Sequence, residues 1–189
     1  PGIIQELRHE APGVSVEMIS GFSNVSQQLR SGRADLALSP LSIEESGVYG
    51  AFLFQDPYVC LMDRSNPLAQ GKLTPKAFSD ASHLIIHYGN SWQPLYHDAM
   101  SSRGLSLNVA VSTPEPEDVR LFLPGTDLVV AMPSRIAHQF ATGLHMCPCP
   151  VPAATQVNMY WPARLNRSPL HEWLRSKILR LAKDIKEQS

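Results

Sequence analysis

The sequence predicts an α/β protein built around a parallel β-sheet. Within residues 1–40, an apolar helical pattern leads into an alternating strand pattern, and a second helix and strand follow after a polar turn. Residues 83–111 repeat the alternation of strand, turn, helix and strand. This order is typical of parallel sheets, which bind ligands at the carboxyl ends of their strands.

The first third of the chain predicts two helices and several strands from its apolar spacing. The pair Pro12-Gly13 ends the first helix, and Ser23 or Asn24 is placed to cap the second, which Gly32 ends. Since the chain opens on a helix, we expect a preceding strand to be missing upstream. The expected elements are a helix over 3–11, a strand over 14–18, a helix over 25–29, a strand over 36–38 and a pair of strands over 48–54 and 58–62.

The rest of the chain predicts a second α/β unit and a long terminal helix. Three prolines make residues 146–152 extended, and they exclude a regular central strand there. Ser168-Pro169 is a helix start, and we expect Arg175, Arg180, Lys183 and Lys186 on the solvated face of that helix. The other expected elements are strands over 83–87, 105–111, 127–132 and 157–161, and helices over 92–100, 118–122 and 136–140.

The composition excludes several classes of protein. The 189 residues suffice for one large domain or two lobes, and 43% hydrophobic with 17% charged residues is ordinary for a globular chain. A net charge of −1 without a basic patch argues against a nucleic-acid surface on this part. No apolar run reaches the roughly 18 residues of a membrane span, so no membrane partner is expected.

The three cysteines, Cys60, Cys147 and Cys149, do not suggest a disulfide framework. We interpret them as thiols of a cytoplasmic protein. The segment His145–Cys149 resembles a soft-metal site, but it lacks a second paired cluster, and packed residues are the alternative. We therefore predict no metal site.

No catalytic constellation is present in the sequence. It contains no nucleophile elbow, no phosphate-binding loop and no dinucleotide fingerprint. His83 and His87 lie on a strand pattern, which argues against a helical zinc pair. The acidic cluster Glu115, Glu117 and Asp118 is expected to cap a helix rather than to act in acid–base chemistry. We predict no enzyme activity, no catalytic residue and no cofactor.

Several phrases, taken in order, resemble a known family: the effector-binding (regulatory) domain of LysR-type transcriptional regulators. The ending is most similar to the subgroup that contains regulators of aromatic degradation and nodulation. The phrases are APGV at 11–14, LRSGRADLA at 29–37, NPLA at 66–69, GTDLVVAMP at 125–133, WPAR at 161–164 and HEWLR at 171–175.

The resemblance implies a two-lobed fold like that of type 2 periplasmic binding proteins, with an effector in the cleft between the lobes. We expect residues 1–78 and 148–189 to form lobe I and residues 79–147 to form lobe II. It also implies an upstream winged helix-turn-helix, absent from this chain, through which alone the protein would contact DNA. Family dimers pair lobe I against lobe II, so the helices over 3–11 and 25–29 are candidate dimer surfaces, with a homotetramer expected for the full-length protein.

The candidate effector-binding residues are those just past the expected strand ends. Helix N-termini there offer N–H groups to an anion, small polar side chains offer neutral donors, and an aromatic ring could cover a ligand ring. Structural alternatives exist: Phe22 could pack on its own helix, Ser39 could be an ordinary turn residue, His87 could be a structural histidine, and Trp161 could be core. The candidates are Phe22, Ser23, Asn24, Ser39, Pro40, His87, Tyr88, Asn90, Thr113 and Pro133.

These observations support one leading function and two alternatives. The leading hypothesis is a ligand-sensing domain that binds a small, aromatic or anionic effector and shifts a multimeric regulator between two arrangements. The first alternative is a solute-binding protein of a transport system with the same fold. The second is an enzyme on this scaffold, which the missing nucleophile–base pair disfavours.

Overall fold

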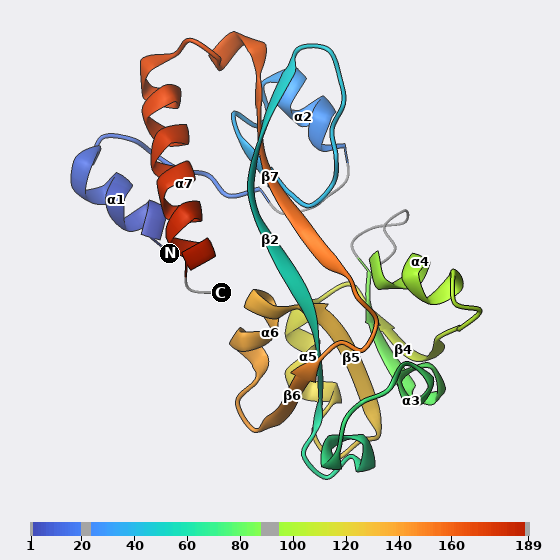
Figure 1. Cartoon of the computed structure of the whole chain (residues 1–189). Coiled ribbons are helices and arrows are strands. Elements are labelled where there is room, and N and C mark those ends of the chain that lie inside the picture. The colour runs from blue at the N-terminus through green and yellow to red at the C-terminus, as the bar shows by residue number, and fades with distance from the viewer. Residues whose placement is uncertain (1, 20–23, 88–94, 188–189) are drawn as a thin grey trace. The chain divides into compact units, whose positions relative to one another are not determined.

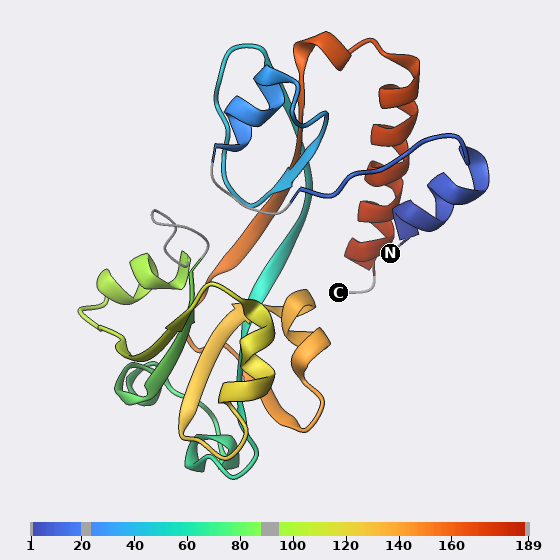
Figure 2. The same cartoon turned by 180° about the vertical axis from the view of Figure 1, so that it is seen from behind.

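The computed structural model describes residues 2–19, 24–87 and 95–187 (Figures 1 and 2). The chain divides into two compact units, which we call unit 1 (Pro1–Gln55 and Gln156–Ser189) and unit 2 (Asp56–Thr155). The sequence analysis placed these boundaries near residues 78 and 148. The observed division falls elsewhere because the second half of a long strand, and the residues after it, pair within unit 2.

In the described residues, unit 1 has a small sheet, three α-helices and one short 3-10 helix. The first half of β2 lies next to β7, and β1 pairs antiparallel with β7 at the edge, where Ser39 lies opposite Asn158. Helix α1 lies alongside α7, as both views show (Figures 1 and 2). The elements are α1 (Gly2–Glu10), α2 (Val25–Ser31), β1 (Ala37–Ser39), β2 (Val48–Asp63), β7 (Ala154–Pro162), the short 3-10 helix η3 (Ala163–Leu165) and α7 (Pro169–Glu187).

The apolar spacing of α7 explains its position. Ile178 and Ala182 are buried with Leu53 of β2 and Met159 of β7, and Leu174 packs against them, so this face of the helix is apolar. Across the sheet, the backbone of β2 approaches the ring of Tyr160 so closely that a Cβ at Gly50 would lie 2.9 Å from it. A side chain at that position would require the Tyr160 ring to shift.

Unit 2 is a mixed sheet with parallel strands in its centre. Strand β3 (Ser82–Ile86) runs parallel to both β4 (Asn108–Thr113) and β5 (Leu128–Pro133). The second half of β2 pairs antiparallel with β5 and, on its other side, with the edge strand β6 (Leu144–Pro148). The edge position of β6 agrees with its proline, because a proline cannot donate to a second neighbour.

The two faces of the unit 2 sheet carry separate cores, because side chains alternate along each strand. Cys60, Met62 and Val129 point to one face, which packs against α3 (Pro75–Asp80) and α4 (Leu95–Ser101). Leu61, Val130 and Met132 point to the other, which packs against α5 (Val119–Phe122) and α6 (Ser134–Phe140). Each fully buried aliphatic side chain stabilises the unit by roughly 1.5–3 kcal/mol. The remaining short helices are η1 (Pro67–Gln70) and η2 (Pro116–Asp118).

Three expectations about strands are wrong. Residues 14–18 form no strand, and Met18 is 84% exposed, because none of the described strands pairs with this segment. The ranges 48–54 and 58–62 are one continuous strand, β2, rather than a pair. Strand β4 begins only at Asn108, so Leu105 and Leu107 precede it and pack against the core as coil.

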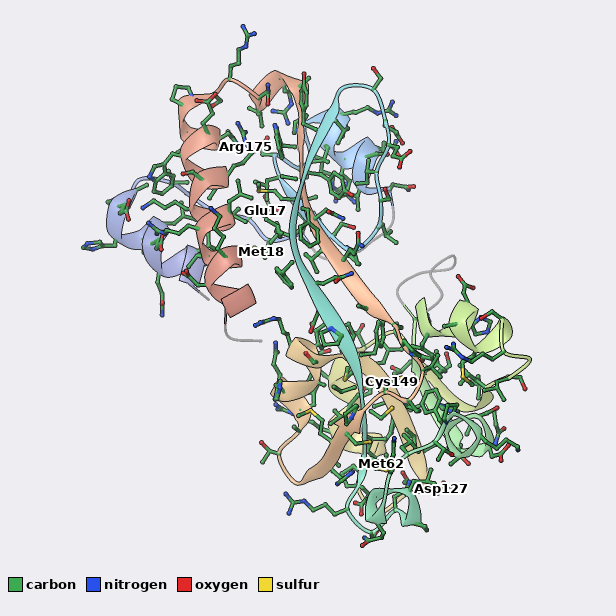
Figure 3. All side chains as sticks on the ribbon, in the orientation of Figure 1. Glu17, Met18, Met62, Asp127, Cys149 and Arg175 are labelled. Atoms are coloured by element: carbon green, nitrogen blue, oxygen red, sulfur yellow. The ribbon has the colours of Figure 1, made fainter. Side chains whose placement is uncertain are left out.

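Arg175 is also misplaced by the sequence analysis, since it is buried rather than solvated (Figure 3). Its guanidinium donates hydrogen bonds to the carbonyls of Leu165 (3.1 Å) and Asn166 (2.7 Å) and lies 4.7 Å from the ring centre of Trp161. Arg180, on the same helix, is exposed as expected and pairs with Glu6. None of the described helices is both long and apolar enough to span a membrane.

We predict that Arg175→Ala lowers the free energy of unfolding by about 2–4 kcal/mol, because two carbonyls lose charge-assisted hydrogen bonds in a buried place. The matched control is Arg180→Ala, which breaks an exposed ion pair and costs less than about 1 kcal/mol. Urea unfolding of both variants measures the difference. Equal losses would contradict the structural role assigned to Arg175.

Candidate ligand-binding edge of unit 2

The three parallel strands of unit 2 end at the same edge of the sheet. Ile86 pairs with Thr113, and the backbone N–H of His87 donates to the Thr113 carbonyl at 3.0 Å. Pro133 ends β5, the other parallel neighbour of β3. We call this site, formed by His87, Thr113 and Pro133, the carboxyl edge. The structure therefore brings these three predicted residues to one edge of one sheet.

The carboxyl edge is also where the chain enters and leaves unit 2. Tyr58 of β2 lies opposite Pro133, and its N–H donates to the carbonyl of Ala153, just before β7. Both chain connections to unit 1, at residues 55–56 and 155–156, therefore leave from this edge. A ligand held here would contact the ends of the parallel strands and lie close to both connections.

The Thr113 hydroxyl makes its hydrogen bonds to residues of the turn that follows β4. It is buried, donates to the carboxylate of Asp118 and accepts from the N–H of Glu115 at 3.2 Å. The expectation that the acidic cluster caps a helix is not met, because neither Glu115 nor Asp118 makes a side-chain cap. Asp118 instead fixes the hydroxyl of Thr113. Thr113 thus holds the turn after β4 in place at the carboxyl edge.

Asp56 is a residue of this edge that the sequence analysis missed. Its buried carboxylate accepts from the hydroxyl of Ser134 (2.6 Å) and from the N–H of Arg135 (3.2 Å). The carboxylate of Asp56 therefore already faces the partial positive charge at the N-terminus of α6. The N–H of Arg135 at this helix start is already hydrogen-bonded within the protein. The sequence offers little signal for this role, because Asp56 lies between Gln55 and Pro57, in the gap between the two expected strands.

His87 and Pro133 are half-buried, so part of each side chain stays accessible. His83, four residues earlier, is a core residue: its Nε2 lies 2.6 Å from the Phe78 carbonyl, and its ring meets that of Phe78 edge-on. Burial lowers the pKa of His83, and its Nδ1 has no partner among the described residues. Within the described part of the chain, no group of three or more His, Cys, Asp or Glu side chains is arranged to hold a metal ion.

Three predicted residues lie in unit 1. Asn24 has a left-handed backbone (φ 58°) before α2 and makes no side-chain cap, so the cap expected from it is not formed. It borders a shallow polar hollow of about 290 Å³, lined also by Gln27, Gln28, Ser31 and Arg33. Ser39 is buried and accepts from the N–H of Leu41, as in an ordinary turn. Pro40 follows it and is half-buried.

The other four candidates, Phe22, Ser23, Tyr88 and Asn90, lie outside the described residues. Trp161 packs in the core of unit 1 and donates from its indole N–H to Asn166 at 2.9 Å. A second hollow, of about 380 Å³, is lined by residues that include Phe140 and Leu144. Leu144 pairs with Asp63 at the far end of β2, so this hollow is not at the carboxyl edge.

Residues 1–183 match the sequence model of the family described as the LysR substrate binding domain. The chain belongs to this family. Among curated relatives, it is 25% identical over 185 residues to the transcriptional activator NagR of a Ralstonia species, covering 96% of this chain and 62% of NagR. It is 27% identical over 181 residues to nodulation protein D 1 of Rhizobium leguminosarum, covering 93% of this chain and 57% of that protein.

A solved structure shares the fold of this chain. The effector-binding domain of BenM, solved with its effector benzoate, superposes with a TM-score of 0.81 at 17% identity, covering 98% of this chain and 86% of that one. At this identity the likeness shows the fold, which confirms the predicted two-lobed α/β class. The chain spans about three fifths of the lengths of NagR and nodulation protein D 1.

We predict that the free energy of unfolding falls as the pH drops from about 7.5 to about 5.5. The pKa of His83 is lowered in the folded state from its ordinary 6.5. Below that value the unfolded chain binds the proton more readily, so acid favours unfolding. Substitution His83→Gln should flatten this pH dependence. Urea unfolding of both proteins across the pH series tests this, and parallel curves for the two proteins would contradict it.

Proposed function

We propose that this chain is the ligand-sensing regulatory domain of a LysR-type transcriptional regulator. The observation that carries the proposal is the carboxyl edge, where three parallel strands end together in a chain of the LysR family. DNA binding would belong to an N-terminal winged helix-turn-helix outside this chain. NagR, a transcriptional activator, is longer than this chain, which supports that division of labour.

The effector we propose is a small aromatic or anionic molecule. Asp56 already satisfies the start of α6, so the imidazole of His87 is the donor at this edge best suited to a carboxylate or phenol. The benzoate bound by BenM is an effector of this class. The proposed contacts are Asn24, Ser39 and Pro40 in unit 1 and His87, Thr113 and Pro133 in unit 2, with Phe22, Ser23, Tyr88 and Asn90 completing the set.

Binding would act by differential affinity. An effector that binds one arrangement of the regulator more tightly shifts the population toward it, and equal affinity would shift nothing. The carboxyl edge suits this role because both chain connections leave unit 2 there. We further propose a cytoplasmic protein without enzyme activity.

The oligomer we propose is a homodimer of this domain and a homotetramer of the full-length protein. Helix α1 remains a candidate for the dimer surface, since Ile4 is exposed on it. Leu29 of α2 is fully buried and belongs to the interior of unit 1. It therefore contributes to folding and cannot contribute to a dimer surface.

The transport alternative loses support from the comparisons. The matching family model is that of the LysR substrate binding domain. The chain resembles NagR and nodulation protein D 1, both regulators or nodulation proteins by name, over nearly its whole length. An upstream reading frame that encodes a helix-turn-helix supports the regulator, whereas one that encodes a secretion signal supports transport.

We predict that benzoate at about 100 times its Kd stabilises the protein by roughly 2.7 kcal/mol, which raises the Tm by roughly 5–10 °C. His87→Ala should weaken binding at least about tenfold, because a hydrogen bond to a charged group is lost. His138→Ala, exposed on α6, is the matched control and should bind like the wild type. Thermal-shift titration measures both.

The same titration with hydroxybenzoates, phenol and short aliphatic acids identifies the preferred chemical class. Binding that His87→Ala and His138→Ala weaken equally would contradict the carboxyl edge as the site. A flat Tm across the whole panel would contradict a small aromatic or anionic effector.

We predict that Leu29→Asp abolishes cooperative unfolding of unit 1, because it places a charge in a fully buried position. Leu170→Asp, on an exposed position of α7, is the control and should leave folding unchanged. Circular dichroism melts and sedimentation read out folding and assembly. A folded, monomeric Leu29→Asp protein would contradict the interior position of Leu29.

A further inference from the structure

The three cysteines, distant in the sequence, meet inside unit 2. Cys60 of β2 lies directly opposite Cys147 of β6 in the antiparallel ladder. Cys149, two residues further along, packs with them against the core that faces α3 and α4 (Figure 3). All three cysteines are free. We call these residues the thiol cluster.

The backbone places Cys60 and Cys147 at a separation that a disulfide can bridge. Directly opposed residues of an antiparallel pair have Cα atoms about 4.5–5.5 Å apart and side chains on the same face. Disulfides span Cα distances of about 4.4–6.8 Å. The bond can therefore form without separating the strands. Cys147 and Cys149, by contrast, lie two residues apart on one extended segment, so they do not face each other across a pair of strands.

The two opposed thiols differ in exposure and in acidity. Cys60 is fully buried, and its hydrogen bonds to the other two thiols together with burial raise its pKa well above the usual value. Cys147 is half-buried, and the hydrogen bond from Cys60 lowers its pKa. Cys147 is therefore both the more accessible thiol and the better thiolate, which are the properties of a reactive cysteine.

We propose that Cys147 and Cys60 are a peroxide-reactive pair that closes into a reversible disulfide between β6 and β2. The Cys147 thiolate attacks one peroxide oxygen, the O–O bond breaks, and the other oxygen leaves as hydroxide, which takes up a proton to become water. Cys147 is now a sulfenic acid. Cys60 gives up its proton, its sulfur attacks the Cys147 sulfur, the S–O bond breaks, and a second water leaves.

In this reaction two thiols are oxidised by two electrons and one hydrogen peroxide is reduced to two waters. A small thiol reductant returns both cysteines to their starting state by exchange. The bond would join the two strands that continue into the connections at residues 55–56 and 155–156. The disulfide would thus close a covalent loop within unit 2, whether or not an effector is bound.

The test is peptide mapping of the wild-type protein after treatment with stoichiometric hydrogen peroxide. Free thiols are first blocked by alkylation, and the digest is run without reductant. In the alkylated digest we expect one linked peptide pair that joins Cys60 to Cys147. In a sample taken before alkylation we expect an intact mass lower by two hydrogens per chain, and three free thiols after dithiothreitol. Cys149→Ala is the matched control and should form the same link, whereas Cys60→Ser should lose it and retain sulfenic acid at Cys147.

Reduced Cys60 beside over-oxidised Cys147 in the wild-type protein would overturn the proposal, and so would a link to Cys149 or a link between two chains. The wild-type map decides the question by itself, so the result does not depend on how well a variant folds. Thermal melts of the reduced variants show whether Cys60→Ser retains the wild-type fold.

Discussion

The antiparallel pairing of β2 with β5 is the constraint on which the rest of the structure depends. From Tyr58 opposite Pro133 to Met62 opposite Val129, it joins the strand that arrives from unit 1 to the parallel strands of unit 2. The pairing places the entry of the chain at the carboxyl edge, where Tyr58 lies opposite Pro133. On the other side of β2, the pairing with β6 brings Cys147 opposite Cys60.

Elements defined by local pattern could be predicted from the sequence. Helix α7 and strand β5 both appear where the sequence places them. Helix α7 buries one face against β2 and β7, and the apolar run of β5 is buried on both faces of its sheet. Residues 14–18 show the limit of this approach. An alternating pattern there satisfies the same rule, but a strand also needs a partner for its backbone hydrogen bonds, and none of the described strands provides one.

The candidate site was predictable in part for the same reason. The rule that parallel strands end together placed His87 near Thr113, which the hydrogen bond between their backbones confirms. Asp56 could not be found this way, because it reaches the start of α6 from a strand 79 residues away in sequence. The burial of Arg175 could not be found this way either. The carbonyls that accept from it precede α7 in the sequence and come close to it only because the chain turns between η3 and α7. Long-range polar contacts decide both positions.

The most direct test of the carboxyl edge is an amide chemical-shift titration of the isotope-labelled protein with benzoate. The account predicts that the largest shifts fall on the amides of His87, Thr113 and Ser134, at the carboxyl ends of β3, β4 and β5. Largest shifts on the amides of Ser82, Asn108 and Leu128, at the opposite ends of these strands, would contradict it.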